Sequence, residues 1–277
     1  MRWPCHAGGK DMKVAIAGAG GRMGRMLIRK VTETEGLDVS GGLEVAGSPV
    51  LGEDLGKMAG LDPLGVTASD DAKAIFAGAD VVIDFTLAEA TSQNALIAAE
   101  LGTAFVVGTT GMDDSQQARI DKAAERVAVV QAGNMSLGVN LLMQVTKQVS
   151  AALGLDWDIE VVESHHRWKV DAPSGTALML GKAAAEGRGQ DHDAVAVGGR
   201  FGITGEREKG SIGYAALRGG NVVGEHQVIF HSDDERLVLG HLANDRALFA
   251  AGAVRAAQWA GGKPAGHYSM LDVLGLA

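Results

Sequence analysis

The chain has a single cysteine, and its aromatic residues make up only 4% of the sequence. Because Cys5 has no second cysteine to pair with, no disulfide can form within the chain and a reducing compartment is expected. The longest uncharged stretch, residues 127–146, is interrupted by polar residues such as Gln131 and Asn140, which favours strand, turn and helix over a bilayer span. The opening residues lack the apolar segment of a signal peptide. We therefore expect a cytoplasmic protein that does not associate with a membrane.

Positive charge is also scarce, since 25 lysine and arginine residues stand against 34 acidic ones and leave a net charge of -9. This balance argues against a nucleic-acid partner, because binding to phosphates requires broad stripes of lysine and arginine. One local basic cluster can still attract a small anion to an acidic protein. The sequence thus allows a small anionic ligand but predicts no nucleic-acid surface.

Glycine, by contrast, is abundant, but its 40 residues are scattered at turns without a repeating period. In the first half, short β-branched runs alternate with helical patterns, which predicts a parallel sheet covered on both faces. Strands are expected at residues 13–17, 37–44, 80–86, 103–108 and 127–131, with one helix beginning near Arg22 and others at 88–101 and 113–126.

The rhythm changes after about residue 134. A long helix at 139–153 precedes a strand at 158–164, and strands at 211–218, 222–231 and 236–242 then follow without helices between them. This succession predicts a second, α+β domain with an open sheet that is mixed or antiparallel. A final helix at residues 246–260 is expected to pack back on the first domain.

The segment KVAIAGAGGRMGR, residues 13–25, runs from a strand through Gly18, Gly20, Gly21 and Gly24 into a helix. Such a turn lets the backbone approach a pyrophosphate at a helix N-terminus, although its spacing is one residue longer than G-x-G-x-x-G. Glu44 lies 20 residues beyond Gly24, where it could accept hydrogen bonds from an adenosine ribose. The alternative is a plain strand-to-helix turn with a surface glutamate.

Two later loops follow strands of the same predicted sheet. They contain Gly108, Thr109 and Thr110 in the first, and Ala132, Gly133, Asn134 and Met135 in the second. Ligands of open parallel sheets bind outside the carboxyl ends of the strands, so we expect both loops to line the nicotinamide half of a dinucleotide site. For the two threonines, capping of the helix near Asp113 is an equal alternative.

Residues 163–177, ESHHRWKVDAPSGTA, concentrate positive and titratable groups. In an extended chain His165 and His166 point to opposite sides and should have different roles. Glu163 and His165 supply only two ligands on one face, whereas zinc sites use three or four, so no metal site is expected. Lys169 can stabilise developing negative charge, and either Lys169 or a histidine can donate a proton.

The same segment ends in a predicted helix start. Pro173 sets a turn, Ser174 is a good N-cap, and Gly175 and Thr176 open an apolar helical run. Free N–H groups at a helix start favour a carboxylate, so we expect a small acid with one or two carboxylates. A solvated basic loop before an ordinary capped helix is the alternative. With a dinucleotide in the other domain, these groups suit reduction of a polarised C=C or C=N bond.

These motifs together resemble the 4-hydroxy-tetrahydrodipicolinate reductase (dihydrodipicolinate reductase) family from about Lys13 to Leu274, with HHRWKVDAPSGTA as the most specific block. The resemblance implies a homotetramer built through the open sheet of a C-terminal substrate domain, residues 137–245. It implies a dinucleotide-binding Rossmann domain of residues 12–136 plus 246–277. The implied reaction is NAD(P)H-dependent reduction of a cyclic 4-hydroxy imine, with loss of water, on the diaminopimelate route to lysine. Residues 1–11 extend beyond the usual start and are expected to form a flexible tail.

The resemblance also assigns roles to residues. His165 would be the acid/base residue and Lys169 the proton donor, while His166, Gly175 and Thr176 would bind the carboxylates of a small dicarboxylate substrate. The implied cofactor contacts are Gly18, Ala19, Gly20, Gly21, Arg22, Met23, Glu44, Gly108, Thr109, Thr110, Ala132, Gly133, Asn134 and Met135.

One departure from the family pattern concerns the cofactor. Members that use NADPH well often carry an arginine directly after the ribose-binding glutamate, where this chain has Val45. Only Arg22 remains as an obvious partner for a 2'-phosphate, so we expect NADH to be preferred over NADPH or used equally. Two other functions stay open from the residues: another two-domain NAD(P)-dependent reductase of an amino-acid derivative, or a non-catalytic dinucleotide-binding sensor.

Overall fold

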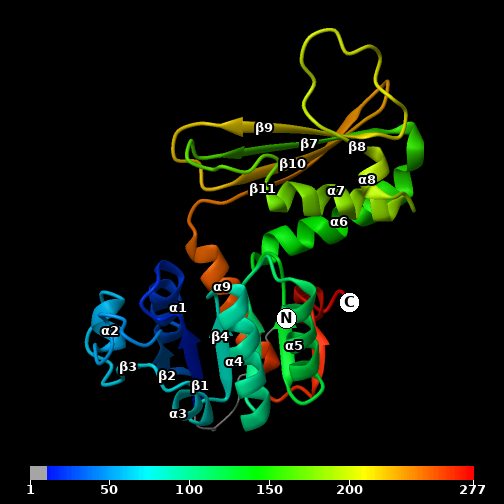
Figure 1. Ribbon diagram of the computed structural model, residues 1–277. Coiled ribbons are helices and arrows are strands. Elements are labelled where there is room, and N and C mark those ends of the chain that lie inside the picture. The colour runs from blue at the N-terminus through cyan, green and yellow to red at the C-terminus, as the bar shows by residue number, and fades with distance from the viewer. Residues whose placement is uncertain (1–10) are drawn as a thin grey trace. The chain divides into compact units, whose positions relative to one another are not determined.

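The computed structural model describes residues 11–277, which form two compact units (Figure 1). Unit 1 comprises the described residues up to Ser136 together with Ala247–Ala277, and unit 2 comprises Leu137–Arg246. Arg246, which the sequence analysis placed in the first domain, belongs to unit 2 because the last long helix begins one residue later. The expected tail at residues 1–11 lies, except for Asp11, outside the described residues. No helix within residues 11–277 is long and apolar enough to cross a membrane.

Unit 1 contains a seven-stranded sheet in which every pairing is parallel and the order is β12-β6-β5-β4-β1-β2-β3. The order 3-2-1-4-5-6 is that of doubly wound dinucleotide-binding folds, here extended by β12. The strands are β1 (Met12–Ala17), β2 (Leu37–Leu43), β3 (Ala68–Ser69), β4 (Val81–Asp84), β5 (Ala104–Val107), β6 (Ala128–Gln131) and β12 (Gly266–Tyr268). The predicted Rossmann-type fold is therefore confirmed.

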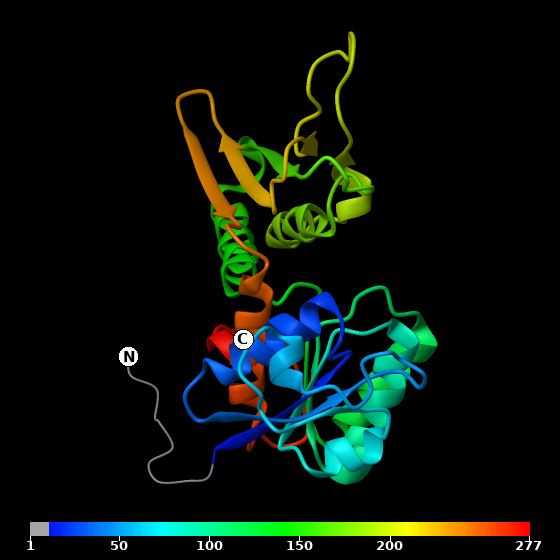
Figure 2. The same cartoon turned by 90° about the vertical axis from the view of Figure 1, so that its left-hand side faces the viewer.

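Helices cover both faces of this sheet. They are α1 (Arg22–Thr32), α2 (Leu55–Met58), α3 (Ala72–Ala77), α4 (Ala88–Leu101), α5 (Asp114–Ala124), α9 (Ala247–Ala260) and α10 (Met270–Leu274). Helices α1 and α9 pack together on one side, whereas α3, α4 and α5 pack on the other (Figure 2). Strands β4 and β5 are buried along their whole length, which explains why they read as uninterrupted apolar runs.

Unit 2 contains a five-stranded mixed sheet of order β11-β10-β7-β9-β8. Strand β7 (Asp158–His165) is antiparallel to β10 (Glu225–His231) and parallel to β9 (Ile212–Arg218), while β11 (Arg236–Leu242) and β8 (Ala196–Val197) form the edges. Helices α6 (Leu137–Leu153) and α7 (Gly175–Gly187) cover one face of this sheet (Figure 1), and the short α8 (His192–Val195) contacts α7. The expected mixed sheet in an α+β unit is confirmed.

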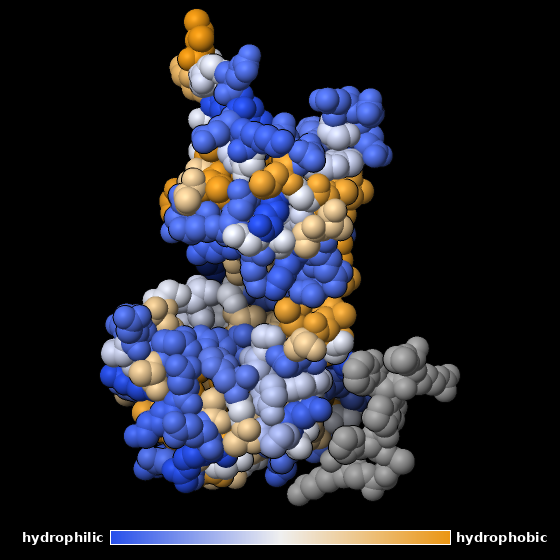
Figure 3. Space-filling view, turned by 90° about the vertical axis from the view of Figure 1, so that its right-hand side faces the viewer, coloured by the Kyte–Doolittle hydropathy of each residue, from blue (hydrophilic) through white to orange (hydrophobic). Residues whose placement is uncertain are grey.

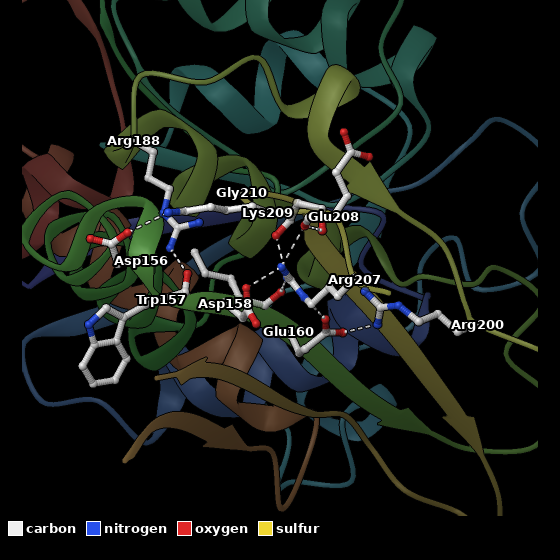
Figure 4. Close-up of polar contacts among 12 residues, drawn as sticks. Asp156, Trp157, Asp158, Glu160, Arg188, Arg200, Arg207, Glu208, Lys209 and Gly210 are labelled. Carbon is white, nitrogen blue, oxygen red and sulfur yellow. Dashed lines mark hydrogen bonds and ion pairs between the residues drawn. The ribbon is translucent and has the colours of Figure 1, made fainter. Parts of the chain in front are cut away.

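An arginine anchors the long connection between β8 and β9 to the start of β7 (Figure 4). Arg207 donates from Nη1 to Asp158 Oδ1 at 2.7 Å and from Nε to Glu160 Oε1 at 3.1 Å. Its Nη2 also reaches the backbone oxygen of Ile159 at 2.9 Å, and Arg200 donates to the second oxygen of Glu160 at 3.1 Å. Arg207, the last residue of the TGER stretch at 204–207, thus has a structural role, because its charge-assisted bonds hold this connection against the strand.

Candidate active site

The glycine-rich turn after β1 has the geometry that its sequence predicts. Gly18 adopts a φ of +70°, which favours glycine, and a Cβ on Gly24 would lie 2.2 Å from the Gly18 carbonyl oxygen. Helix α1 then begins at Arg22 with Gly21 as its N-cap, without a side-chain capping bond and without an acidic residue in its first turn. The turn therefore combines close backbone packing with a helix start that suits an anion.

The acidic residue expected to bind a ribose lies against this turn. The N–H of Gly20 donates to Glu44 Oε1 at 2.6 Å, and a Cβ on Gly20 would lie only 2.9 Å from the same oxygen. The neighbouring Val45 is 73% exposed, and Arg22 is exposed at the start of α1. Glycine turn and glutamate, 24 residues apart in sequence, thus meet at one end of the sheet.

The loops after β5 and β6 also come together. They surround a pocket of about 260 Å³ that is lined by Thr109, Thr110, Gly111, Met112, Gln117, Gln131, Ala132 and Gly133. Four of the predicted cofactor residues therefore share one cavity at the carboxyl ends of adjacent strands, where ligands of open parallel sheets bind. These loops and the glycine cradle fit a nicotinamide dinucleotide.

The other predicted cofactor residues occupy supporting positions. Gly108 packs against the ring of Phe85, since a Cβ there would approach ring carbons to 2.2 Å. Asn134 Oδ1 accepts a hydrogen bond from the Ser136 N–H at 2.8 Å before α6 begins, and Met135 is buried. Ala19 is buried and Met23 half-buried around the glycine turn.

Thr109 does not cap a helix, so the capping alternative is wrong for this residue. The N-cap of α5 is Asp113, whose side chain accepts from the Gln116 N–H in a capping box. The Thr109 hydroxyl instead lies 2.8 Å from Thr91 Oγ1 and 3.3 Å from the Thr86 carbonyl oxygen. Its side chain thus ties the loop after β5 to the loop after β4 and to helix α4.

A buried carboxylate that sequence reasoning missed organises this end of unit 1. Asp84, the last residue of β4, is fully buried and accepts from the Thr86 N–H, Thr91 Oγ1 and Asn94 Nδ2, each at 2.8 Å. Because Thr91 also bonds Thr109, the network extends from β4 to the pocket loop. The sequence signal was a carboxylate at a strand end followed by two polar residues on one helical face.

In unit 2, the residues of β7 alternate between buried and half-buried, and Glu163 and His165 lie on the buried face. The Glu163 carboxylate is only 1% exposed, and its Oε2 lies 2.6 Å from His165 Nδ1. Arg218 of β9 donates to both carboxylate oxygens, at 2.8 and 2.7 Å, and the Ser174 N–H donates to Oε1 at 3.0 Å. One buried carboxylate is therefore hydrogen-bonded to a histidine, to an arginine and to the residue that precedes α7.

These contacts control protonation. Burial opposes the charge of Glu163, but hydrogen bonds from Arg218, His165 and Ser174 outweigh burial and hold its pKa below the ordinary value. Burial lowers the pKa of His165, and the Glu163 carboxylate partly offsets this effect. The result is an ionised acid beside a histidine that is neutral at pH 7.

The two adjacent histidines have different partners, as their alternation in an extended chain predicts. His165 is bound to Glu163, whereas His166 Nε2 lies 3.3 Å from Arg246 Nη2 and its ring stands 5.8 Å from that of Trp168. In the following loop, Lys169 Nζ lies 2.8 Å from Asp171 Oδ1. His165, His166 and Lys169 thus come from one short segment, but each contacts a different charged residue.

The predicted cap of α7 is confirmed. Ser174 Oγ accepts from the Ala177 N–H at 3.2 Å, so Gly175 and Thr176 are the first two helical residues. The same hydroxyl lies 3.0 Å from Nε2 of His226 on β10, a buried histidine that sequence reasoning did not single out. Burial, followed by repulsion from His165, lowers the pKa of His226 to about 4. Within residues 11–277, no three His, Cys, Asp or Glu side chains are grouped to hold a metal ion.

Two family models match the chain in succession. The model of the dihydrodipicolinate reductase N-terminus covers residues 12–135, and that of the C-terminus covers residues 138–274. A 4-hydroxy-tetrahydrodipicolinate reductase of Parvibaculum lavamentivorans is 54% identical over 267 residues, which are 96% of this chain and 98% of the relative. A reductase of the same name from a Ruegeria species is 55% identical over 95% of this chain and 98% of its own length.

Solved structures share the fold. A dipicolinate-bound dihydrodipicolinate reductase from Paenisporosarcina sp. TG-14 superposes with a TM-score of 0.76 at 22% identity, over 95% of this chain and 98% of that one. An amine dehydrogenase from Mycobacterium smegmatis has a TM-score of 0.64 at 13% identity, over 94% and 95% of the two chains. The two solved structures alone do not separate a reductase from an amine dehydrogenase, but the sequence matches, which span both units, are to reductases. The chain belongs to the family of 4-hydroxy-tetrahydrodipicolinate reductases, also called dihydrodipicolinate reductases.

Proposed function

We propose that this chain reduces 4-hydroxy-tetrahydrodipicolinate to tetrahydrodipicolinate with a nicotinamide cofactor, on the diaminopimelate route to lysine. The observation that carries the proposal is the Glu163 cluster, in which a histidine able to exchange a proton shares one buried carboxylate with the start of α7. In the overall reaction the substrate gains a hydride and a proton and loses water.

Substrate binding is assigned to the start of α7 and to the preceding basic loop. The backbone N–H groups of Gly175 and Thr176 lie at the helix N-terminus, where a carboxylate is stabilised by hydrogen bonds and by the helix dipole. His166 adds a second donor, since its buried Nδ1 has no hydrogen-bond partner among residues 11–277. Lys169 brings a positive charge to the same segment.

Proton transfer is assigned to His165 and Lys169. Because His165 Nδ1 is engaged by Glu163, Nε2 is the ring nitrogen left for the substrate. Lys169 is the second candidate donor, and its charge is near enough to His165 to act on the pKa of that histidine. The cofactor, when bound to unit 1, supplies the hydride.

For the cofactor itself, we propose that NADH is preferred or used as well as NADPH. The Gly20 N–H holds the Glu44 carboxylate in place, which favours two ribose hydroxyls and disfavours a 2'-phosphate through charge repulsion. Val45 carries no charge to offset that repulsion. Two exposed cations lie at the helix start, Arg22 and also Arg25, whose Nε donates to the Gly20 carbonyl oxygen at 3.1 Å.

We propose a cytoplasmic homotetramer that assembles through the open face of the unit 2 sheet. Alternation along the strands places Leu217, Val238 and Leu242 on the face opposite α6 and α7, and they are 58%, 51% and 61% exposed. Phe201 and Ile203, in the connection between β8 and β9, are also fully exposed, and Figure 3 shows hydrophobic atoms on the surface of unit 2. Apolar surface of this extent supports burial between subunits.

Steady-state kinetics of His165→Gln and Lys169→Ala test the proposed chemistry. Loss of a general acid should lower kcat with the cyclic imine and NADH by about 10²- to 10⁴-fold. His231→Gln and Lys182→Ala are matched controls in unit 2, because His231 lies at the opposite end of β10 from His226 and Lys182 is exposed on α7. Folded His165 and Lys169 variants with wild-type turnover would contradict the assignment.

A further inference from the structure

We propose that Glu163 is a positioning residue: its carboxylate selects the tautomer of His165 and ties that histidine to the helix start that binds the substrate carboxylate. This inference rests on the proposed role of His165. It adds a residue outside the assigned contacts, because Glu163 is enclosed on the helix-covered side of the sheet and touches neither ligand site directly.

The hydrogen bonds of Glu163 determine which nitrogen of His165 carries a proton. Glu163 Oε2 is hydrogen-bonded to His165 and Arg218, while Oε1 accepts hydrogen bonds from Arg218 and the Ser174 N–H. An ionised carboxylate only accepts hydrogen bonds, so His165 Nδ1 must be the donor. Nε2 is then left to exchange a proton, and Gly224 leaves space beside it, since a Cβ there would lie 3.0 Å from Nε2.

The same carboxylate sets the distance between His165 and the start of α7. The Ser174 N–H that donates to Glu163 belongs to the N-cap residue, whose hydroxyl accepts from the Ala177 N–H. Any movement of Glu163 would therefore displace the histidine and the helix start together. A displacement of reacting groups by about 1 Å can lower the rate of an enzyme by about 10²-fold.

Arg218 holds the carboxylate and extends the network to Lys169. Its two terminal nitrogens contact both oxygens of Glu163, and Nη2 also donates to the Asp171 carbonyl oxygen at 2.6 Å. The Asp171 side chain lies 2.8 Å from Lys169 Nζ. Both proposed proton-transfer residues are thus connected to one arginine and one buried carboxylate.

The charges around His165 come from every neighbouring element of unit 2. Glu163 is on its own strand, Arg218 on β9, His226 on β10, and Lys169 in the following loop. Of these groups only Glu163 stabilises the protonated ring, whereas positive charge on Lys169 and Arg218 disfavours it. Removal of the carboxylate charge should therefore lower the pKa of His165 further.

Glu163→Gln tests the proposal, with Glu160→Gln as the matched control. Glu160 lies three residues earlier on β7, on the opposite face, and is also bound by two arginines. Glu163→Gln should lower kcat by about 10- to 100-fold, the range found when the partner that orients a functional histidine is removed. The limb of the pH profile that reports His165 should move to lower pH, and the control should change neither quantity.

A second measurement does not depend on catalysis. The titration of His165 can be followed by ¹³C NMR of histidine-labelled protein, with its signal assigned from the spectrum of His165→Gln. The midpoint should fall in Glu163→Gln and stay in place in Glu160→Gln. If Glu163→Gln fails to fold, the double variant Glu163→Gln with Arg218→Met removes both charges of the pair. Its His165 midpoint should still fall, but by less, because the loss of Arg218 also removes a positive charge that lowers the pKa of His165.

The outcomes separate this inference from the function on which it rests. An unchanged His165 midpoint in a folded variant overturns the positioning role, even if kcat falls, because the loss is then merely structural. A lowered midpoint with wild-type kcat supports the contact but overturns the acid/base role of His165. A lowered midpoint together with reduced kcat supports both.

Discussion

Acidification from pH 7 to pH 4 should destabilise unit 2 through one buried histidine, His226. The pKa of its side chain is about 4 in the folded protein and about 6.5 when the chain is unfolded, because burial and the nearby His165 oppose its charge. The ring is 4% exposed, its Nε2 lies 3.0 Å from Ser174 Oγ, and its Nδ1 has no hydrogen-bond partner among the described residues. A second proton would therefore be buried without an acceptor.

The sign and size of the effect follow from proton linkage. Above pH 6.5 both states are neutral at this site; between pH 6.5 and 4 the unfolded chain binds a proton that the folded chain excludes, so stability falls. Below pH 4 the folded state is protonated as well and the loss levels off. Since a tenfold difference in proton affinity corresponds to about 1.4 kcal/mol, the full loss is roughly 3 kcal/mol.

Urea unfolding followed by circular dichroism at pH 7, 6, 5 and 4 measures this loss in the wild type and in His226→Gln. Other groups, including Glu163 with its lowered pKa, also lose stabilising charge in acid, but they do so in both proteins. The wild type should lose roughly 3 kcal/mol more than the variant between pH 7 and pH 4. Measurements at two protein concentrations separate unfolding from subunit dissociation. Equal losses in the two proteins would falsify the reasoning.

Two further predictions concern the cofactor and the assembly. Val45→Arg should raise the ratio of kcat/KM for NADPH to kcat/KM for NADH by about tenfold or more, because a charged hydrogen bond to the 2'-phosphate contributes about 1.5 to 3 kcal/mol. A strong preference of the wild-type protein for NADPH would refute our assignment. Leu217→Glu should shift sedimentation from tetramer towards smaller species, because it places a charge on the open face of the sheet, and a wild type that sediments as a monomer would rule out the interface.

Most of the fold could be predicted because its elements carry strong local signals. Residues 88–101 were expected to be helical, and α4 spans Ala88–Leu101, with Gly102 in a left-handed conformation at its end. The fully apolar runs of β4 and β5 identified buried parallel strands. The two-residue strand β3 and the three-residue strand β12 went unpredicted, because segments so short have no periodicity of their own.

The candidate sites were predictable in part, for the same reason. The glycine turn, the Ser174 cap and the alternation of His165 and His166 are properties of a few consecutive residues, and each could be read locally. Arg218, in contrast, contacts Glu163 across 55 residues of sequence, and His226 contacts Ser174 across 52. No local pattern distinguishes these two side chains from ordinary strand residues.

The amino-acid sequence by itself determined which segments form strands and helices, which turn can approach a dinucleotide, and which family the chain belongs to, because these depend on short-range periodicity and on contiguous motifs. Only the tertiary structure decided that β7 lies between an antiparallel β10 and a parallel β9. That pairing brings Arg218 and His226 to the buried side of His165 and converts Glu163 from one acidic residue among 34 into the enclosed carboxylate of the candidate active site. The physical reason is that low dielectric and hydrogen-bond satisfaction act through space, on neighbours that the order of residues does not specify.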